Sequence, residues 1–197
     1  QKTTVDWLRF RTQAQPLEAL EALRPLFGTH GLSLRFEHLK RGILGFQRAA
    51  MLRIDDMPIG RVDYGGDSQR GWVRVDITGK GCEWVQSWDD LSEVEALPSA
   101  SIRRLDLALT TWDGEVNHDQ VVSAHSAGRF ITRGRPPALR QIISSDIHAG
   151  KTCEIGTREK SDKFMRCYEK GRELVGKLCL RGLDVTHIDG ILIEDIY

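Results

Sequence analysis

The sequence has no net charge and lacks several features that define common protein classes. Among its 197 residues, 28 Lys and Arg balance 28 Asp and Glu. No apolar run reaches the roughly eighteen residues that a membrane-spanning helix needs, so a membrane partner is not expected. The four cysteines form no CxxC pair, which disfavours a zinc site. With no secretory signal, the expected location is cytoplasmic, with reduced thiols.

The zero total hides an uneven distribution of charge. Residues 129–181 contain 13 basic and 6 acidic side chains, a net charge of +7, whereas residues 83–128 have a net charge of −7. The flanking segments 1–82 and 182–197 carry net charges of +4 and −4. Two interpretations stay open at this point. The uneven charge is either a chance fluctuation on a solvated surface or a phosphate-binding face, because Lys and Arg release counterions from DNA.

Length and patterning predict the fold class. Apolar-polar alternation predicts strands, and apolar residues three or four apart predict helices. The expected strands are Thr3–Phe10, Trp72–Thr78, Ile102–Leu109, Gln141–Ile147, Thr152–Ile155 and Lys163–Glu169. The expected helices are Pro16–Phe27, Cys82–Leu97, His118–Ala127 and Arg172–Arg181. Short alternations between residues 42 and 77 indicate hairpins. We therefore expect an α+β fold with a mostly antiparallel central sheet, flanking helices and active-site residues on strands.

Tyr168 is the first candidate for chemistry. Arg166 and Lys170 stand two residues before and after it, so a regular strand places all three on one face. A free phenol has a pKa of about 10, and nearby cations favour the nucleophilic phenolate. The competing interpretation is a half-buried structural tyrosine on a basic strand.

Asp76 and Asp106 form a second candidate group, because each lies on the polar face of an expected strand. Two carboxylates on adjacent strands can hold a hard divalent cation together with water. Two simpler interpretations stay open: both aspartates are merely solvated, or they form cross-strand salt bridges with Arg74 and Arg104.

Four ordered stretches of the sequence match one known family. They are Val5–Leu8, Val73–Cys82, Arg103–Leu109 and Glu154–Gly171. The last stretch contains a glycine-x-arginine-x-x-serine segment followed by an arginine-x-tyrosine-x-lysine strand. Over roughly residues 4–173, the chain resembles the replication initiation factor family of rolling-circle replication proteins, which occur in plasmids, filamentous phages and integrative elements.

The resemblance implies an activity and assigns residues to it. Tyr168 would attack a DNA phosphodiester at an origin and become joined to the 5′ phosphate, and the freed 3′ hydroxyl would prime synthesis. Arg166 and Lys170 would assist catalysis, and Asp106 and Asp76 would hold Mg²⁺ or Mn²⁺. The expected DNA-binding residues are Arg133, Arg135, Arg158, Lys160, Ser161 and Lys163. The expected partners are origin DNA, as a single strand or a hairpin, and the host helicase and polymerase.

The sequence departs from the family at two points. Thr110 replaces an acidic residue that often follows the strand aspartate by four positions. A later acidic strand is expected shortly after Tyr197, so we expect residues 1–197 to be a single nicking domain that is truncated at its C-terminus. The sequence also lacks the histidine-hydrophobic-histidine motif of other nickases.

Two alternative functions follow from these departures and from the aromatic residues. One is a catalytically inactive protein that binds origin DNA or regulates a phage or mobile element. The other is an RNA-binding module in which Trp72, Phe164 and Tyr168 stack on bases.

Overall fold

The computed structural model describes residues 2–111, 116–131, 134–145, 150–157, 163–169 and 191–196. The chain divides into two compact units, which are described separately. One unit is Val5–Leu105, called here the N-terminal unit. The other consists of Gln1–Thr4 and Asp106–Tyr197, called the C-terminal unit. Within the described residues, no helix has the length and apolar character needed to cross a membrane.

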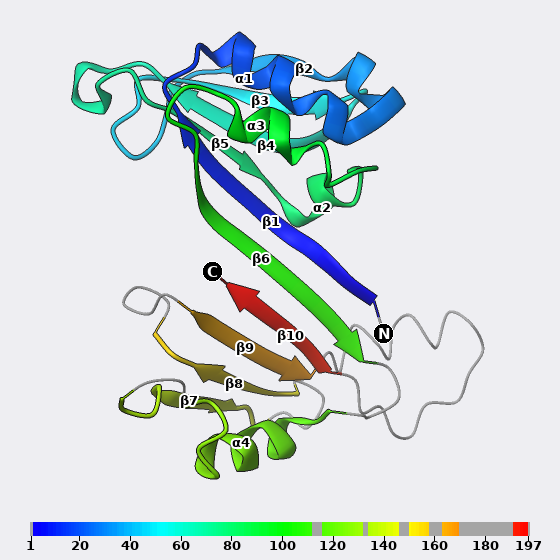
Figure 1. The fold of residues 1–197 in the computed structure, drawn as a ribbon, viewed down its shortest axis with the longest axis vertical. Helices are drawn as coiled ribbons and strands as arrows, with labels where there is room; N and C mark the ends of the chain where they lie inside the picture. Colours follow the sequence, from blue (N-terminus) through cyan, green and yellow to red (C-terminus); the bar gives the residue numbers. More distant parts are fainter. Residues whose placement is uncertain are drawn as a thin grey trace. The chain divides into compact units, whose positions relative to one another are not determined.

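The N-terminal unit is a sheet with helices on one face (Figure 1). Its strands are paired antiparallel in the order β2-β3-β4-β5-β1. Their bounds are β1 (Lys2–Thr12), β2 (Arg35–Leu39), β3 (Arg48–Ile54), β4 (Met57–Tyr64) and β5 (Val73–Ile77). The helices are α1 (Pro16–Leu23), α2 (Gly79–Cys82) and α3 (Leu91–Glu95), with 3₁₀ segments η1 (Pro25–Ser33) and η2 (Asp67–Gln69).

One face of this sheet forms the core because its side chains alternate. Leu8 and Phe10 of β1 and Val75 of β5 point to the helices and are fully buried. Leu20 and Leu23 of α1 pack against them, as the helical spacing of the sequence predicts. The residues between these strand positions, among them Arg and Asp, therefore lie on the face that the helices do not cover.

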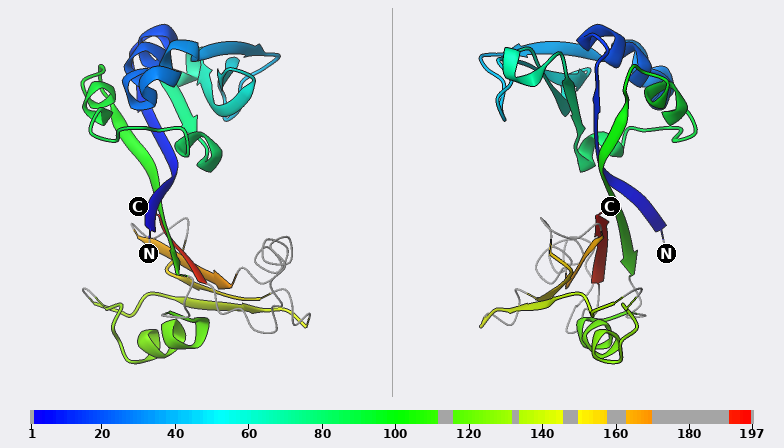
Figure 2. Two further views of the ribbon diagram at one scale, coloured as in Figure 1. Left: turned by 90° about the vertical axis from the view of Figure 1, so that its right-hand side faces the viewer. Right: turned by 60° about the vertical axis from the view of Figure 1, so that its left-hand side comes forward.

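The C-terminal unit contains a second antiparallel set of strands, in the order β6-β10-β9-β8-β7. Their bounds are β6 (Ser101–Thr111), β7 (Leu139–Ile143), β8 (Lys151–Ile155), β9 (Phe164–Glu169) and β10 (Ile191–Ile196). Helix α4 (His118–Ser126) packs beside β8 and β9 (Figure 2). Its Val121 contacts a small core with Cys153, Ile155 and Cys167, which leaves Tyr168, the next residue along, on the other face of β9.

Local sequence fixes the start of α4. Asn117 precedes the helix, and its Oδ1 accepts a hydrogen bond from the backbone N–H of Gln120 at 2.9 Å. The Gln120 side chain returns the contact, its Oε1 accepting from the backbone N–H of Asn117 at 2.9 Å. This reciprocal capping box satisfies two donors at the helix end, and it confirms the predicted helix after Asn117.

The α+β class and the mostly antiparallel sheet predicted from the sequence are confirmed. The predicted helix Cys82–Leu97 is wrong, because only Gly79–Cys82 and Leu91–Glu95 are helical. Between them, the backbone N–H groups of Gln86 and Ser87 both donate to the carbonyl of Leu26, at 2.8 and 3.3 Å. A tertiary contact thus replaces the helical hydrogen bonds. The predicted helix Arg172–Arg181 lies outside the described residues.

Candidate functional site

Tyr168 lies on β9 in the middle of the C-terminal strands. Its backbone pairs with Thr152 of β8 on one side and with Leu192 of β10 on the other. Alternation along β9 places Phe164 and Arg166 on the same face as Tyr168. Phe164 is buried, whereas Arg166 and Tyr168 are partly exposed. The predicted grouping of tyrosine and arginine on one strand face is therefore present in the structure.

A buried carboxylate holds Arg166 in place. Nε and Nη2 of Arg166 donate to Oε1 of Glu154 at 3.1 and 2.6 Å, across the β8–β9 pair. The second oxygen of Glu154 lies 3.7 Å from Nη1 of Arg140 on β7. Glu154 is only 8% exposed, so its negative charge is compensated by two arginines. Glu154 was not predicted as a site residue; it shares the strand face of Thr152, whose backbone pairs with Tyr168.

Asp106 lies in the same unit, on β6, and is 2% exposed. Its backbone pairs with Ile196 of β10, which in turn pairs with Phe164 of β9. Asp106 and Tyr168 are thus two strands apart and four residues apart along the strands. Standard strand geometry puts their backbones about 16 Å from each other. Asp106 and Tyr168 are therefore not immediate neighbours on the sheet.

Thr110, the residue at which the sequence departs from the family by lacking an acid, lies on β6 in register with Tyr168. Through Leu192 of β10, Tyr168 is in register with Thr110 of β6. The family resemblance predicts an acid at this β6 position. This chain has threonine there.

The run Ile191–Ile196 forms β10 itself, between β6 and β9. Its register pairs the backbone of Glu194 with Ala108 on β6 and with Arg166 on β9. An acidic strand therefore does lie beside the tyrosine strand. The signal was present in the sequence as two acids, Glu194 and Asp195, in an otherwise apolar run.

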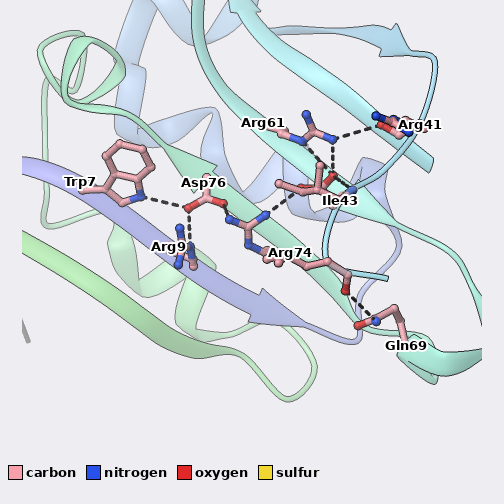
Figure 3. A network of polar contacts seen from close by, with 10 residues as sticks. Trp7, Arg9, Arg41, Ile43, Arg61, Gln69, Arg74 and Asp76 are labelled. Atoms are coloured by element: carbon pink, nitrogen blue, oxygen red, sulfur yellow. Dashed lines mark hydrogen bonds and ion pairs between the residues drawn. The ribbon is translucent and has the colours of Figure 1, made fainter. Parts of the chain in front are cut away.

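Asp76 belongs to the N-terminal unit, where cations occupy both of its oxygens (Figure 3). Arg9 Nε donates to Oδ1 at 2.5 Å, and the indole N–H of Trp7 donates to the same oxygen at 3.0 Å. Arg74 forms an ion pair with Oδ2. Asp76 is 4% exposed. These contacts favour the cross-strand salt bridge over a metal ligand, and the assignment of Asp76 as a ligand stays a prediction.

The described residues supply few ligands for a divalent cation. Within the part of the chain that the structure describes, no three His, Cys, Asp or Glu residues form a group that could hold a metal ion. Magnesium is often bound by only one or two carboxylates together with substrate phosphates and water. Asp106, with a buried hard oxygen donor, fits that pattern as a single ligand.

Only part of the predicted DNA-binding set is described. Lys163 precedes β9 and Arg135 lies in the segment before β7, and both are exposed. The other predicted DNA-binding residues lie outside the described residues; they are Arg133, Arg158, Lys160 and Ser161. The predicted catalytic residue Lys170 also lies outside them. Their roles remain predictions.

The geometry defines an antiparallel α+β protein with a tyrosine and a fixed arginine on one strand. Residues 100–181 match the sequence model of the replication initiation factor family. This match covers β6 to β9 and includes Asp106, Glu154, Arg166 and Tyr168. The match covers less than half of the chain and agrees with the family resemblance that the sequence motifs carry.

A solved structure has a similar fold over nearly the whole chain. It is described as the structure of a rolling-circle replication initiator protein from Geobacillus stearothermophilus. The TM-score is 0.64 at 23% sequence identity, and the alignment covers 98% of this chain and 73% of that one. This likeness shows the fold. A comparison with curated proteins gave no match.

Proposed function

We propose that the chain is a rolling-circle replication initiator that nicks and rejoins one strand of origin DNA through Tyr168. The observation that carries the proposal is the position of Tyr168. It lies on β9 on the same face as Arg166, which Glu154 fixes, and inside the segment that matches the family model. A tyrosine that attacks a phosphate needs a nearby cation, and Arg166 supplies one at the required spacing.

The reaction transfers a phosphodiester to tyrosine. The Tyr168 oxygen attacks phosphorus, its proton goes to a base, and the bond from phosphorus to the 3′ oxygen breaks. The released 3′ oxygen takes up a proton, so the products are a 5′-phosphotyrosine ester and a free 3′ hydroxyl. Because the ester conserves the phosphodiester bond, the reverse attack by a 3′ hydroxyl rejoins the strand without ATP. The Arg166 guanidinium offsets negative charge on the equatorial oxygens in the transition state.

Asp106 is the residue that we expect to hold Mg²⁺ or Mn²⁺. A bound divalent ion would polarise the phosphate and offset its charge. The Asp106 carboxylate is buried on β6, so its position is fixed by the sheet rather than by a loop.

A covalent-adduct assay tests the proposal. The protein is incubated with Mn²⁺ and a supercoiled plasmid that carries DNA flanking its gene, and the products are separated on a denaturing gel. We expect a protein–DNA adduct that disappears in Tyr168→Phe and when EDTA is added. Tyr64→Phe is the matched control, because Tyr64 lies on β4 of the other unit. An adduct that persists in Tyr168→Phe would contradict the assignment.

Thr110 favours a second candidate function, an origin-DNA-binding protein that has lost catalysis. The family's acidic residue is absent at the β6 position aligned with Tyr168. This alternative predicts salt-sensitive binding to the same DNA without cleavage. If the plasmid is nicked in a metal-dependent way, this alternative is excluded.

A further inference from the structure

Six charged residues form an alternating pattern on the helix-free face of the N-terminal sheet. They occupy two neighbouring rows across β4, β5 and β1. One row reads Arg61, Asp76, Arg9 and the other reads Asp63, Arg74, Arg11. We call these six residues the arginine face. Opposite charges alternate at every position except one, where Arg11 stands directly across from Arg74.

The inner members of the arginine face are buried and closed among themselves. Asp63 is 0% exposed, and its two oxygens accept from Arg61 at 2.7 Å and from Arg74 at 2.9 Å. Its Oδ1 also accepts the backbone N–H of Ile43 at 3.2 Å. Arg74 is 5% exposed and bridges Asp63 and Asp76 (Figure 3). These ion pairs hold the charged side chains in place on the sheet face. The carboxylates of Asp63 and Asp76 are both paired with arginines, so neither is available to neutralise a further cation.

Arg11 is the member without a matching acid. It is partly exposed and forms no ion pair with any described carboxylate. Like charges directly opposite each other on neighbouring strands are destabilising. The same repulsion acts on Arg74: burial lowers its pKa most, Asp76 and Asp63 raise it, and Arg9 and Arg11 lower it further. The face thus carries unbalanced positive charge that an anion would relieve.

Trp7, the aromatic residue beside the arginine face, already contacts other side chains of the same unit. Trp7 donates its indole N–H to Asp76, and the guanidinium carbon of Arg104 lies 4.4 Å from the Trp7 ring centroid. One side of the ring is therefore covered by a cation and the polar edge is occupied. The face offers positive charge rather than a stacking platform, which fits a phosphate backbone better than it fits exposed bases.

We propose that the arginine face binds the sugar-phosphate backbone of DNA without reading its sequence. Arg11, Arg9 and Arg61 provide the contacts, because they lie at the partly exposed edge of the buried ion pairs. The choice of DNA over another polyanion rests on the proposed function. The arginine face belongs to the unit that does not contain Tyr168.

The experiment measures binding apart from catalysis. All proteins carry Tyr168→Phe, and fluorescence anisotropy follows a fluorescein-labelled, mixed-sequence single-stranded 30-mer from low to high salt. Arg11→Gln is the main variant because it breaks no described ion pair, and Arg11→Gln with Arg61→Gln is the second. Arg48→Gln is the matched control: Arg48 is exposed on β3, on the side of the sheet that bears the buried Ala50 and Leu52.

Each removed phosphate contact should reduce the slope of log affinity against log salt by about 0.7. This corresponds to an affinity loss on the order of fivefold at 0.1 M salt. The double variant should lose about twice that slope, and Arg48→Gln should match the parent protein. Thermal unfolding verifies that each variant is folded.

Three results overturn the inference: parent protein that does not bind the 30-mer at low salt, an unchanged slope in folded Arg11→Gln and double variants, or an equal loss in Arg48→Gln. None of these depends on whether the wild-type protein nicks DNA. Conversely, a protein that fails to form the Tyr168 adduct but shows the Arg11 effect contradicts the proposed nicking function and leaves the arginine face supported.

Discussion

Both units of the chain pair arginines with carboxylates across neighbouring strands, but the two sets differ in exposure. In the N-terminal unit, the side chains of Arg74 and Asp63 are 5% and 0% exposed. In the C-terminal unit, the side chain of Arg166 is 34% exposed while the side chain of its partner Glu154 is 11% exposed. The Arg74–Asp63 pair is buried on both sides. The Arg166–Glu154 pair keeps a buried acid but presents its arginine at the surface.

The difference separates a buried structural pair, Arg74–Asp63, from a pair that presents a cation at the surface, Arg166–Glu154. A buried ion pair is costly to break, because the remaining charge has no water. A half-exposed arginine on a buried acid is oriented yet can still contact a phosphate. Of the two, only the Arg166 pair lies on a strand that also carries a candidate nucleophile, Tyr168.

Asp63→Ala should have the largest effect, and that effect should be on stability. The variant leaves Arg61 and buried Arg74 without one partner each, which we expect to reduce the free energy of unfolding by about 3–5 kcal/mol. Urea denaturation measures the change. Glu37→Gln, which removes the exposed partner of Arg53, should cost less than about 1 kcal/mol. Similar losses in both variants would show that burial does not distinguish these pairs.

Arg166→Gln should come next, and its effect should be on activity. Loss of one charge-stabilising donor at a reacting phosphate slows the chemical step on the order of 100-fold. The initial rate of adduct formation measures it, with thermal unfolding as the check on folding. Arg140→Gln is the matched control, because Arg140 is 73% exposed and 3.7 Å from the same carboxylate. We expect its rate to stay within about twofold of wild type.

Glu154→Gln should have an intermediate effect that depends on Arg166. The amide keeps the shape of the carboxylate but loses the charge that orients the guanidinium. A positioning group displaced by about 1 Å can cost up to about a hundredfold, and we expect about a tenfold slower adduct formation. In an Arg166→Gln background the same substitution should change little. Additive effects of the two substitutions would mean that Glu154 acts independently of Arg166.

The two core cysteines should show the smallest effect, namely protection from alkylation. Cys153 and Cys167 are opposite each other on β8 and β9 and are both 0% exposed. The hydrogen bond with Cys153, together with burial, raises the pKa of the Cys167 thiol above its usual value. Since the thiolate is the reactive form, this thiol stays protonated and unreactive at pH 8.

Mass spectrometry after iodoacetamide treatment tests this protection, with glutathione as the reference thiol. We expect Cys167 to be unmodified in the native protein and fully modified in urea. Alkylation of native Cys167 at the rate of glutathione would contradict the buried position of Cys167 on β9.

Patterns that depend on near neighbours in the sequence predicted the fold well. The strand predicted at Thr3–Phe10 is part of β1, and the helix predicted at His118–Ala127 is α4. The helix predicted at Cys82–Leu97 failed because Leu26, far away in the sequence, takes the hydrogen bonds of Gln86 and Ser87. Periodicity contains no information about such distant partners.

The candidate site was predictable to the same extent. The Arg166–Tyr168 spacing places both residues on one strand face, and alternation alone determines this. The partner of Arg166 was not predictable, because Glu154 lies on another strand and only the β8–β9 register makes them meet. The partners of Asp76 were not predictable either. Its place on the polar face of a strand suggested a metal ligand, but the strand register places it beside Arg9 and Arg74.

The sequence by itself determined the family resemblance, the tyrosine on a strand and the separation of charge along the chain, because these depend on residue identity and short spacing. The tertiary structure decided which charges meet. It inserted β10 between β6 and β9, and it buried Asp63, Arg74 and Asp76 together while leaving Arg11 unmatched. The physical reason is that strand register sets cross-strand partners, and register is fixed by pairing between segments that are distant in the sequence.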